Sequence, residues 1–442
     1  MNDSIVRRGL KRMRELVGAQ PQASDRQLTH RQLQQLRQQL QECADGLGGE
    51  VSARQRAARL GASYLRLDDA GRREFLRLIA LEFGPEPAAV ATAHAAYQAA
   101  VGTPGQWDAE AVLRATLRSP RLRILTQFTA LPQGVKVLVD LRADLLRYLD
   151  HHPELLALDR ELEARLTDWF DVGFLELARI TWNSPAALLE KLIQYEAVHE
   201  IRSWEDMRNR LDSDRRCYAF FHPRMPKEPL IFVEVALTDH LAGSIQALLD
   251  EAAPVFDAKR ADTAIFYSIS STQPGLRGVS FGNFLLKRVI EDLQRDFPRL
   301  KTFATLSPLP QFSAWVKRTP EALAGIELDA KALTAGEWRH DAKLARRLRE
   351  PLSRLAARYL LEARHNDRPH DPVARFHLGN GAHVERVNWL ADSSQRGLRQ
   401  SFGLMVNYRY DPDAIENNVE AYVADGTVAA SATVRRHARV RK

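Results

Sequence analysis

Residues 263–296 read TAIFYSISSTQPGLRGVSFGNFLLKRVIEDLQRD. The first nine, Thr263–Ser271, are rich in β-branched and aromatic side chains, which is typical of a buried strand. From Phe281 to Asp296, apolar residues recur at the spacing of an amphipathic helix. The stretch between them, Gln273–Gly282, holds one proline and three glycines. This order predicts a strand, a glycine-bearing loop and a helix, which together form the basic unit of an α/β domain.

The residues of the loop alone allow three interpretations. A glycine-bearing loop that opens a helix leaves backbone N–H groups unpaired, and with the helix dipole they can bind an anion such as a pyrophosphate. A simple strand-to-helix turn fits the pattern equally well. Gly278–Gly282 is also a literal Gly-x-Ser-x-Gly, the pattern of a nucleophile elbow, which would make Ser280 a candidate nucleophile of an α/β-hydrolase.

The sequence on both sides of this unit predicts more strands and helices. We expect strands at Cys217–His222, Pro229–Leu237 and Thr302–Leu306, helices at Ser184–Val198, Ser244–Asp250 and 340–363, and a mixture of short strands and glycines over 376–410. From about Gly426 the chain is rich in Ala, Ser, Thr and Arg, and we expect a flexible basic tail there.

Residues 1–170 show helical periodicity and no chemical motif. Predicted helices fall at Leu28–Leu40, Arg54–Leu67, Arg72–Phe83, Ala88–Val101, Ala109–Leu117, Val135–Leu149 and Pro153–Trp169. The predicted fold class is therefore α+β, with an all-α packing or oligomerisation domain over 1–170, a mixed-sheet α/β domain over 171–425 and the tail over 426–442.

Composition excludes several classes of protein. Two cysteines among 442 residues, Cys43 and Cys217, exclude a disulfide scaffold and a Cys-rich zinc module. No HExxH run is present, so a catalytic zinc is not expected. No apolar run approaches the roughly 18 residues that span a bilayer. The Arg-rich start, Met1–Gln20, contains Asp3 and Glu15, which disfavour a mitochondrial presequence, so we expect a bacterial-type cytoplasmic protein.

The basic charge is weak support for nucleic-acid binding. The net charge of +7 comes from 63 basic and 56 acidic residues, and both signs are mixed along the chain except in the last eight residues. Such a surface suits an anionic small ligand as well as it suits DNA or RNA.

The flanks of the loop favour one interpretation. Arg277–Leu286 resembles the CoA-pyrophosphate loop of the GNAT acetyltransferase superfamily, with Ser280 in place of its first glycine. Over about 170–412 the chain resembles the malonyl-CoA decarboxylase family, and the similar segments come in the family's order. They are Ile180–Pro185, Phe266–Ser270, Phe284–Ile290, Leu293–Pro298, Leu306–Phe312, Phe376–Ala382, Asn388–Ser394 and Gly403–Tyr410.

This resemblance implies a GNAT-like catalytic domain that converts malonyl-CoA to acetyl-CoA and CO2 without a metal or an organic cofactor. It places the catalytic pair on Ser307, in Leu-Ser-Pro, and on His377, in Phe-His-Leu. It also implies self-association, with a homotetramer as the expected state, and neither a nucleic-acid nor a membrane partner. The implied CoA contacts are Arg277, Gly278, Val279, Ser280, Phe281, Gly282 and Asn283, with Ser268, Asn407 and Tyr408 as further candidates near the acyl group.

One departure and three rival functions remain. Better-known members of the family carry Glu at the position of Ser280, which puts an acid–base role there in doubt. A GNAT-type N-acyltransferase would share the fold and the loop but would need an amine acceptor. A serine hydrolase would need Ser280, and a nucleic-acid binder would need the basic residues 433–442.

Overall fold

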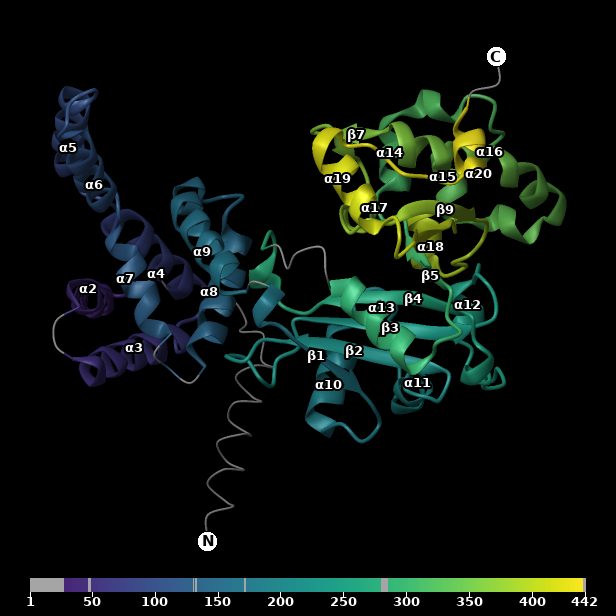
Figure 1. Ribbon diagram of the computed structural model, residues 1–442, viewed down its shortest axis with the longest axis horizontal. Helices are drawn as coiled ribbons and strands as arrows, with labels where there is room; N and C mark the ends of the chain where they lie inside the picture. Colours follow the sequence, from purple (N-terminus) through teal and green to yellow (C-terminus); the bar gives the residue numbers. More distant parts are fainter. Residues whose placement is uncertain are drawn as a thin grey trace, which may run out of the picture. The chain divides into compact units, whose positions relative to one another are not determined.

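The computed structural model describes residues 28–46, 49–129, 131, 133–170, 172–279 and 285–439 (Figure 1). The chain divides into two compact units. The first consists of residues up to Trp169 together with Gln273–Val279, and the second of Phe170–Thr272 and the residues from Ser280 onward. In the described ranges, no helix is long and apolar enough to cross a membrane.

The first unit is built from helices, as the periodicity predicts. Its core is a cluster of buried side chains that includes Phe75, Ile79 and Leu141. Thr29 and Asp68 cap two of the helices by accepting hydrogen bonds from backbone N–H groups of the first turn. The helices are α2 (His30–Asp45), α3 (Glu50–Leu65), α4 (Asp69–Glu82), α5 (Pro87–Ala100), α6 (Gln106–Thr116), α7 (Pro120–Phe128), α8 (Gly134–Tyr148) and α9 (Leu156–Trp169), with the 3-10 turns η1 (Pro153–Leu155) and η4 (Pro274–Leu276).

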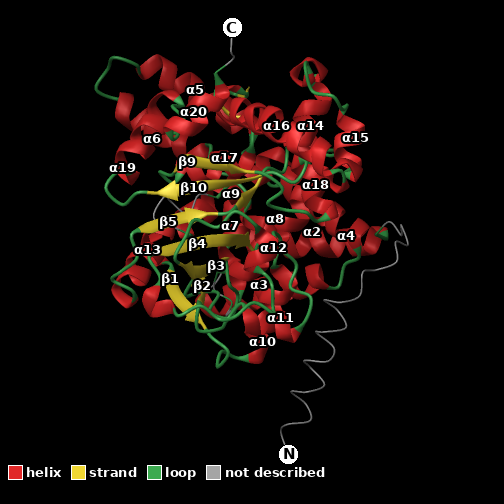
Figure 2. Ribbon diagram, turned by 90° about the vertical axis from the view of Figure 1, so that its right-hand side faces the viewer, coloured by secondary structure: helices red, strands yellow, loops and turns green. Residues whose placement is uncertain are grey.

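The second unit is organised around one eight-stranded mixed sheet. Its strand order is β1-β2-β3-β4-β5-β10-β6, and β9 pairs with the other edge of β10. Among the paired strands of the described residues, β4 and β5 run parallel and the other pairs are antiparallel (Figure 2). The strands are β1 (Glu176–Ile180), β2 (Arg215–Phe221), β3 (Ile231–Thr238), β4 (Thr263–Ser271), β5 (Thr302–Thr305), β6 (Ser307–Pro308), β9 (His383–Asn388) and β10 (Met405–Tyr410).

The parallel pair confirms the strand, loop and helix order of residues 263–296. Parallel neighbours need a crossover connection, and here α13 (Leu285–Asp296) supplies it between β4 and β5. Leu286, Val289 and Leu293 lie on its buried side at the spacing of one helix face. The predicted fold class, a helical region followed by a mixed-sheet α/β region, is confirmed.

Helices surround this sheet, and a short hairpin is formed by β7 (Arg364–His365) and β8 (Arg368–Pro369). A 3-10 turn, η2 (Val172–Phe174), precedes β1. The remaining elements are α10 (Ala186–Tyr195), α11 (Trp204–Asn209), α12 (Ile245–Leu248), η3 (Ala258–Arg260), α14 (Phe312–Arg318), η5 (Pro320–Leu323), α15 (Ala330–Ala335), η6 (Glu337–His340), α16 (Ala342–Glu362), α17 (Pro372–Gly379), α18 (Gln395–Ser401), α19 (Ile415–Asp425) and α20 (Ala432–Ala438).

Two expectations about the last hundred residues are corrected. The start of 376–410 is helical, because Asp371 caps α17 and Pro372 occupies its first turn. The expected flexible tail is folded as far as residue 439, whereas 440–442 lie outside the described residues. Ser431 N–H donates to the Val384 carbonyl at 2.9 Å, and Val434 of α20 is 1% exposed. The tail is therefore anchored by β9 and by apolar burial, which composition alone did not reveal.

Candidate active site

Ser307 and His377 are brought together by two elements far apart in the sequence. Ser307 begins β6, where it lies opposite Val406 of β10. His377 lies in the last turn of α17, which starts at the Asp371 cap. The Ser307 Oγ and His377 Nε2 atoms are 2.9 Å apart, and the two residues are 6% and 3% exposed.

A line of hydrogen bonds continues on both sides of this pair. The Ser307 hydroxyl donates to Thr305 Oγ1 at 2.8 Å. Because its single hydrogen is used there, Ser307 Oγ accepts from His377, and the ring N–H is on Nε2. Nδ1 is then the acceptor, and the Tyr410 hydroxyl donates to it at 2.8 Å. The tautomer of His377 is therefore set by its two neighbours.

The surroundings keep the imidazole neutral. Burial lowers the pKa of His377 from its ordinary 6.5 to about 3. The ring of Tyr408 stacks on the imidazole, with 4.6 Å between centroids and 26° between planes. No carboxylate contacts the ring among the described residues, so His377 is a neutral hydrogen-bond donor at pH 7.

The pair faces a small apolar cavity. Its volume is about 260 Å³, and its described lining residues include no Asp, Glu, Lys or Arg. It lies where β3, β4, β6 and α17 meet. The lining residues are Val198, Ile231, Phe266, Tyr267, Ile269, Ser271, Ser307, Pro308, Pro372, Val373, Phe376 and His377.

Comparison with known proteins identifies the family. The family model "Malonyl-CoA decarboxylase C-terminal domain" matches residues 173–442, and "Malonyl-CoA decarboxylase N-terminal domain" matches 83–170. The chain belongs to the malonyl-CoA decarboxylase family.

Relatives and solved structures agree with this assignment. A mitochondrial malonyl-CoA decarboxylase of Anser anser anser is 38% identical over 421 residues, covering 86% of this chain and 83% of the relative. The mitochondrial malonyl-CoA decarboxylase of Rattus norvegicus is 40% identical over 349 residues, covering 71% of this chain and 70% of the relative. The crystal structure of malonyl-CoA decarboxylase from Rhodopseudomonas palustris has a TM-score of 0.84 at 44% identity, covering 91% of this chain and 99% of that one.

The three residues expected near the acyl group are not among the described residues that line the cavity. The Ser268 hydroxyl donates to the Glu196 carboxylate, at 2.8 Å from Oε2. Asn407 is fully buried, and its amide donates to the carbonyls of Ala242 and Thr305. Tyr408 presents its ring to His377. These side chains help to hold β4, β10 and the His377 imidazole, and their expected contact with the acyl group stays a prediction.

The expected CoA loop is described only in its first part. Arg277 is exposed, Gly278 has a φ of +87°, and Val279 is buried. Ser280, Phe281, Gly282 and Asn283 lie outside the described residues.

Sequence reasoning did not single out two members of the hydrogen-bonded line, Thr305 and Tyr410. A signal for both was present. Tyr410 is two residues beyond Tyr408 in β10, and Thr305, the last residue of β5, is two residues before Ser307. In an extended chain, side chains two residues apart point to the same side, so each was a neighbour of a residue that was named.

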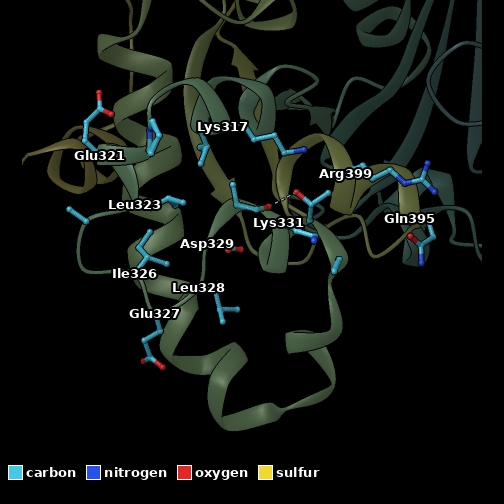
Figure 3. Close-up of a pocket in the computed structure, with 16 residues that line it drawn as sticks. Lys317, Glu321, Leu323, Ile326, Glu327, Leu328, Asp329, Lys331, Gln395 and Arg399 are labelled. Atoms are coloured by element: carbon cyan, nitrogen blue, oxygen red, sulfur yellow. Dashed lines mark hydrogen bonds between the residues drawn. The ribbon is translucent and has the colours of Figure 1, made fainter.

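A second, larger hollow lies elsewhere in the sheet unit (Figure 3). Its volume is about 950 Å³, and it is lined by residues of α14, η5, α15 and α18 and of the segments that join them. Lys317, Lys331 and Arg399 lie along it, but no serine or histidine is among the described residues that line it. The smaller cavity is therefore the candidate active site. Among the described residues, no cluster of three or more His, Cys, Asp or Glu could hold a metal ion.

Proposed function

We propose that this protein decarboxylates malonyl-CoA to acetyl-CoA and CO2. The observation that carries the proposal is the Ser307–His377 pair at 2.9 Å on the wall of an apolar cavity, in a chain of the malonyl-CoA decarboxylase family. Breaking the bond between the α-carbon and the carboxylate leaves the electron pair on the α-carbon and the thioester oxygen. The thioester carbonyl is itself the electron sink, so the reaction needs neither pyridoxal nor a metal.

The apolar lining of the cavity supports CO2 release. A carboxylate that leaves water for a site without a cationic side chain loses its hydration, whereas the neutral CO2 does not depend on it. Among the described lining residues no lysine or arginine is present to compensate this loss. The same environment strengthens any hydrogen bond to the charge that grows on the enolate.

We propose His377 as the proton donor and Ser307 as its orienting partner. The proton leaves Nε2 and joins the α-carbon, and solvent later restores it. A neutral imidazole is a weak acid, but a thioester enolate is a strong base, so the transfer is downhill without an imidazolium. The Tyr410 hydroxyl on Nδ1 stabilises the charge that this transfer leaves on the ring.

We further propose that Arg277, Gly278 and Val279 open the CoA-pyrophosphate site, which Ser280–Asn283 complete. This loop connects β4 to α13, which is where the resemblance expects it. The exposed Arg277 is suited to a phosphate, whereas two neighbouring cations already have partners. Lys287 pairs with Glu416 at 3.0 Å, and Arg288 donates to the Leu175 carbonyl at 2.7 Å.

The decisive experiment is incubation with malonyl-CoA in the absence of any amine. Equal amounts of acetyl-CoA and CO2 support decarboxylation. Free CoA without CO2 contradicts it and favours hydrolysis, whereas turnover that requires an added amine favours an N-acyltransferase. As a matched variant, we expect Ser280→Ala to reduce turnover only modestly, because the serine carries no covalent step. A complete loss in Ser280→Ala would favour the hydrolase.

We also propose self-association, with a homotetramer as the expected state, through α5 and α6. These two helices pack on each other, and α6 has no buried residue. Large apolar side chains on and beside them are exposed, among them Trp107 at 72% and Val112 at 57%. An apolar helix pair of this kind suits a second copy of the chain.

Trp107→Glu is expected to weaken that association at least about tenfold, because a buried aromatic anchor commonly carries much of an interface. Sedimentation velocity over a concentration series measures the change. Val51→Glu is the matched control, because Val51 is 71% exposed on α3, outside the pair. An unchanged distribution of species in Trp107→Glu would contradict the proposal.

The expected bacterial-type cytoplasmic location stays a proposal. It is supported by the similarity to the Rhodopseudomonas palustris structure, whereas the relatives from goose and rat are named as mitochondrial. Fractionation of cells that express the full chain tests it.

A further inference from the structure

The first part of the glycine-bearing loop, which leads into the expected CoA loop at Arg277, belongs to the helical unit. Gln273–Val279 belongs to the same compact unit as α8 and α9, although the chain before and after it belongs to the sheet unit. The approach is close at Gly275, where an added Cβ would lie 1.8 Å from the carbonyl oxygen of Val139 in α8. Only glycine allows this contact, so the loop backbone lies directly on the helix.

A single buried arginine ties this backbone down. Arg142 of α8 has a side chain that is 2% exposed. Its Nη1 donates to the Gly275 carbonyl at 3.0 Å and to the Arg277 carbonyl at 2.7 Å. Hydrogen bonds with a charged donor are about twice as strong as neutral ones, and here both acceptors belong to the loop.

Two carboxylates of α9 orient the guanidinium. Arg142 Nε donates to Asp159 Oδ1 at 2.9 Å, and Nη2 lies 3.2 Å from Glu163 Oε2. Asp159 is only 6% exposed. The buried positive charge of Arg142 is therefore balanced by a buried carboxylate of the same unit. All three guanidinium nitrogens of Arg142 therefore have partners, and these contacts fix the orientation of the planar group.

The arginine also determines which way the next peptide points. In a trans peptide the C=O of Arg277 and the N–H of Gly278 point in opposite directions. Since the carbonyl faces Arg142, the Gly278 N–H is directed away from it, and this N–H has no hydrogen-bond partner among the described residues. Gly278 has a φ of +87°, and a Cβ there would lie 2.5 Å from Glu163 Oε1. The backbone donor is thus presented by the same arginine and glutamate.

We propose that Arg142, with Asp159 and Glu163, is a positioning residue for CoA: it holds the loop backbone so that the Gly278 N–H is available to the pyrophosphate. The inference rests on the proposed function, because it concerns the same loop. Arg142, Asp159 and Glu163 act on the loop backbone and are not partners of Ser307 or His377 among the described residues. A loss at Arg142 should accordingly change KM much more than kcat.

The test compares Arg142→Lys with Arg121→Lys in the full-length protein. Arg121 is a matched control, because it is buried in the same unit, pairs with Glu161 at 2.7 Å and donates to the Ala80 carbonyl, but does not contact the loop. Calorimetry with CoA and steady-state kinetics with malonyl-CoA are the readouts. For Arg142→Lys we expect the Kd of CoA and the KM to rise about tenfold or more, with kcat within about threefold. For Arg121→Lys both constants should stay within about twofold.

Glu163→Gln keeps the proposal testable if Arg142→Lys does not fold. The Glu163 side chain is 37% exposed, so its replacement is mild, and we expect a smaller rise in KM. A folded Arg142 or Glu163 variant with unchanged CoA affinity, or with a lower kcat at unchanged KM, would overturn the inference. That result is distinct from failure of the proposed function, in which the wild type itself releases no CO2 from malonyl-CoA.

Discussion

His377→Asn is expected to lower the rate of acetyl-CoA formation by about 10² to 10⁴-fold, the range that a positioned general acid contributes. Asparagine fits the buried site and can still hydrogen-bond Ser307, but its amide cannot supply the proton that Nε2 holds. CoA binding should change little, because the proposal places His377 at the α-carbon and assigns it no contact with the CoA phosphates. Single-turnover kinetics and a CoA titration of the same variant measure the two effects separately.

His222→Asn is the control for loss of a buried histidine. His222 is 5% exposed, close to the 3% of His377, and lies next to Phe170, not at the cavity. Its replacement should leave turnover near that of the wild type. Near-normal turnover in His377→Asn, or an equal loss in both variants, would remove His377 from the chemistry.

The low pKa of His377 makes the same variant informative about pH. Because burial lowers the folded pKa from 6.5 to about 3, the unfolded chain binds this proton more tightly. Folding stability is therefore lost as pH falls from about 6.5 toward 3, and it is fully present above. Denaturant unfolding at pH 7.5 and 5 should show a smaller loss in His377→Asn than in the wild type. No ionisation of His377 near pH 6.5 should appear in the kcat profile.

Arg210→Met is expected to cost about 3–5 kcal/mol of folding free energy, the typical result of removing one partner of a buried ion pair. Arg210 Nε donates to Asp206 Oδ1 at 2.8 Å and Nη1 to Glu234 Oε2 at 2.9 Å. Its side chain is 1% exposed, as is that of Glu234. Methionine fills the space but leaves two carboxylates without their cation. Burial raises the pKa of Glu234, and loss of the Arg210 guanidinium, which opposes that rise, would raise the pKa further and favour protonation of the carboxylate.

Two further variants separate this effect from loss of packing. Arg210→Met combined with Glu234→Gln removes the orphaned charge on β3, so part of the stability should return. Arg37→Met breaks an exposed pair with Glu82 at 2.8 Å, and we expect a loss below about 1 kcal/mol. Denaturant unfolding followed by circular dichroism provides the measurement. An equal loss in Arg210→Met and Arg37→Met would contradict the buried network.

Local pattern predicted much of the fold. The strand Thr263–Ser271 has the bounds that its composition indicated, and the helices of the first unit follow their apolar periodicity. The predictions failed at two kinds of place. One is a helix start marked by only two residues, and the other is a segment held by residues that are distant in the sequence. The Asp371-Pro372 helix start was overlooked, and α20 is held by β9, which lies more than forty residues earlier.

The sequence by itself determined the β4–loop–α13 unit, because side-chain periodicity and glycines act over a few residues. Its motif order also singled out Ser307 and His377 as a pair. Only the tertiary structure decided how that pair is held and which hydrogen bonds it makes. The tautomer of His377 depends on Thr305 and Tyr410, and the contact itself joins residues seventy positions apart. Likewise, Arg142 reaches the Gly275 carbonyl across 133 positions. Every residue has a backbone carbonyl. The side-chain pattern of a sequence therefore cannot show which carbonyl will accept a hydrogen bond from a distant arginine.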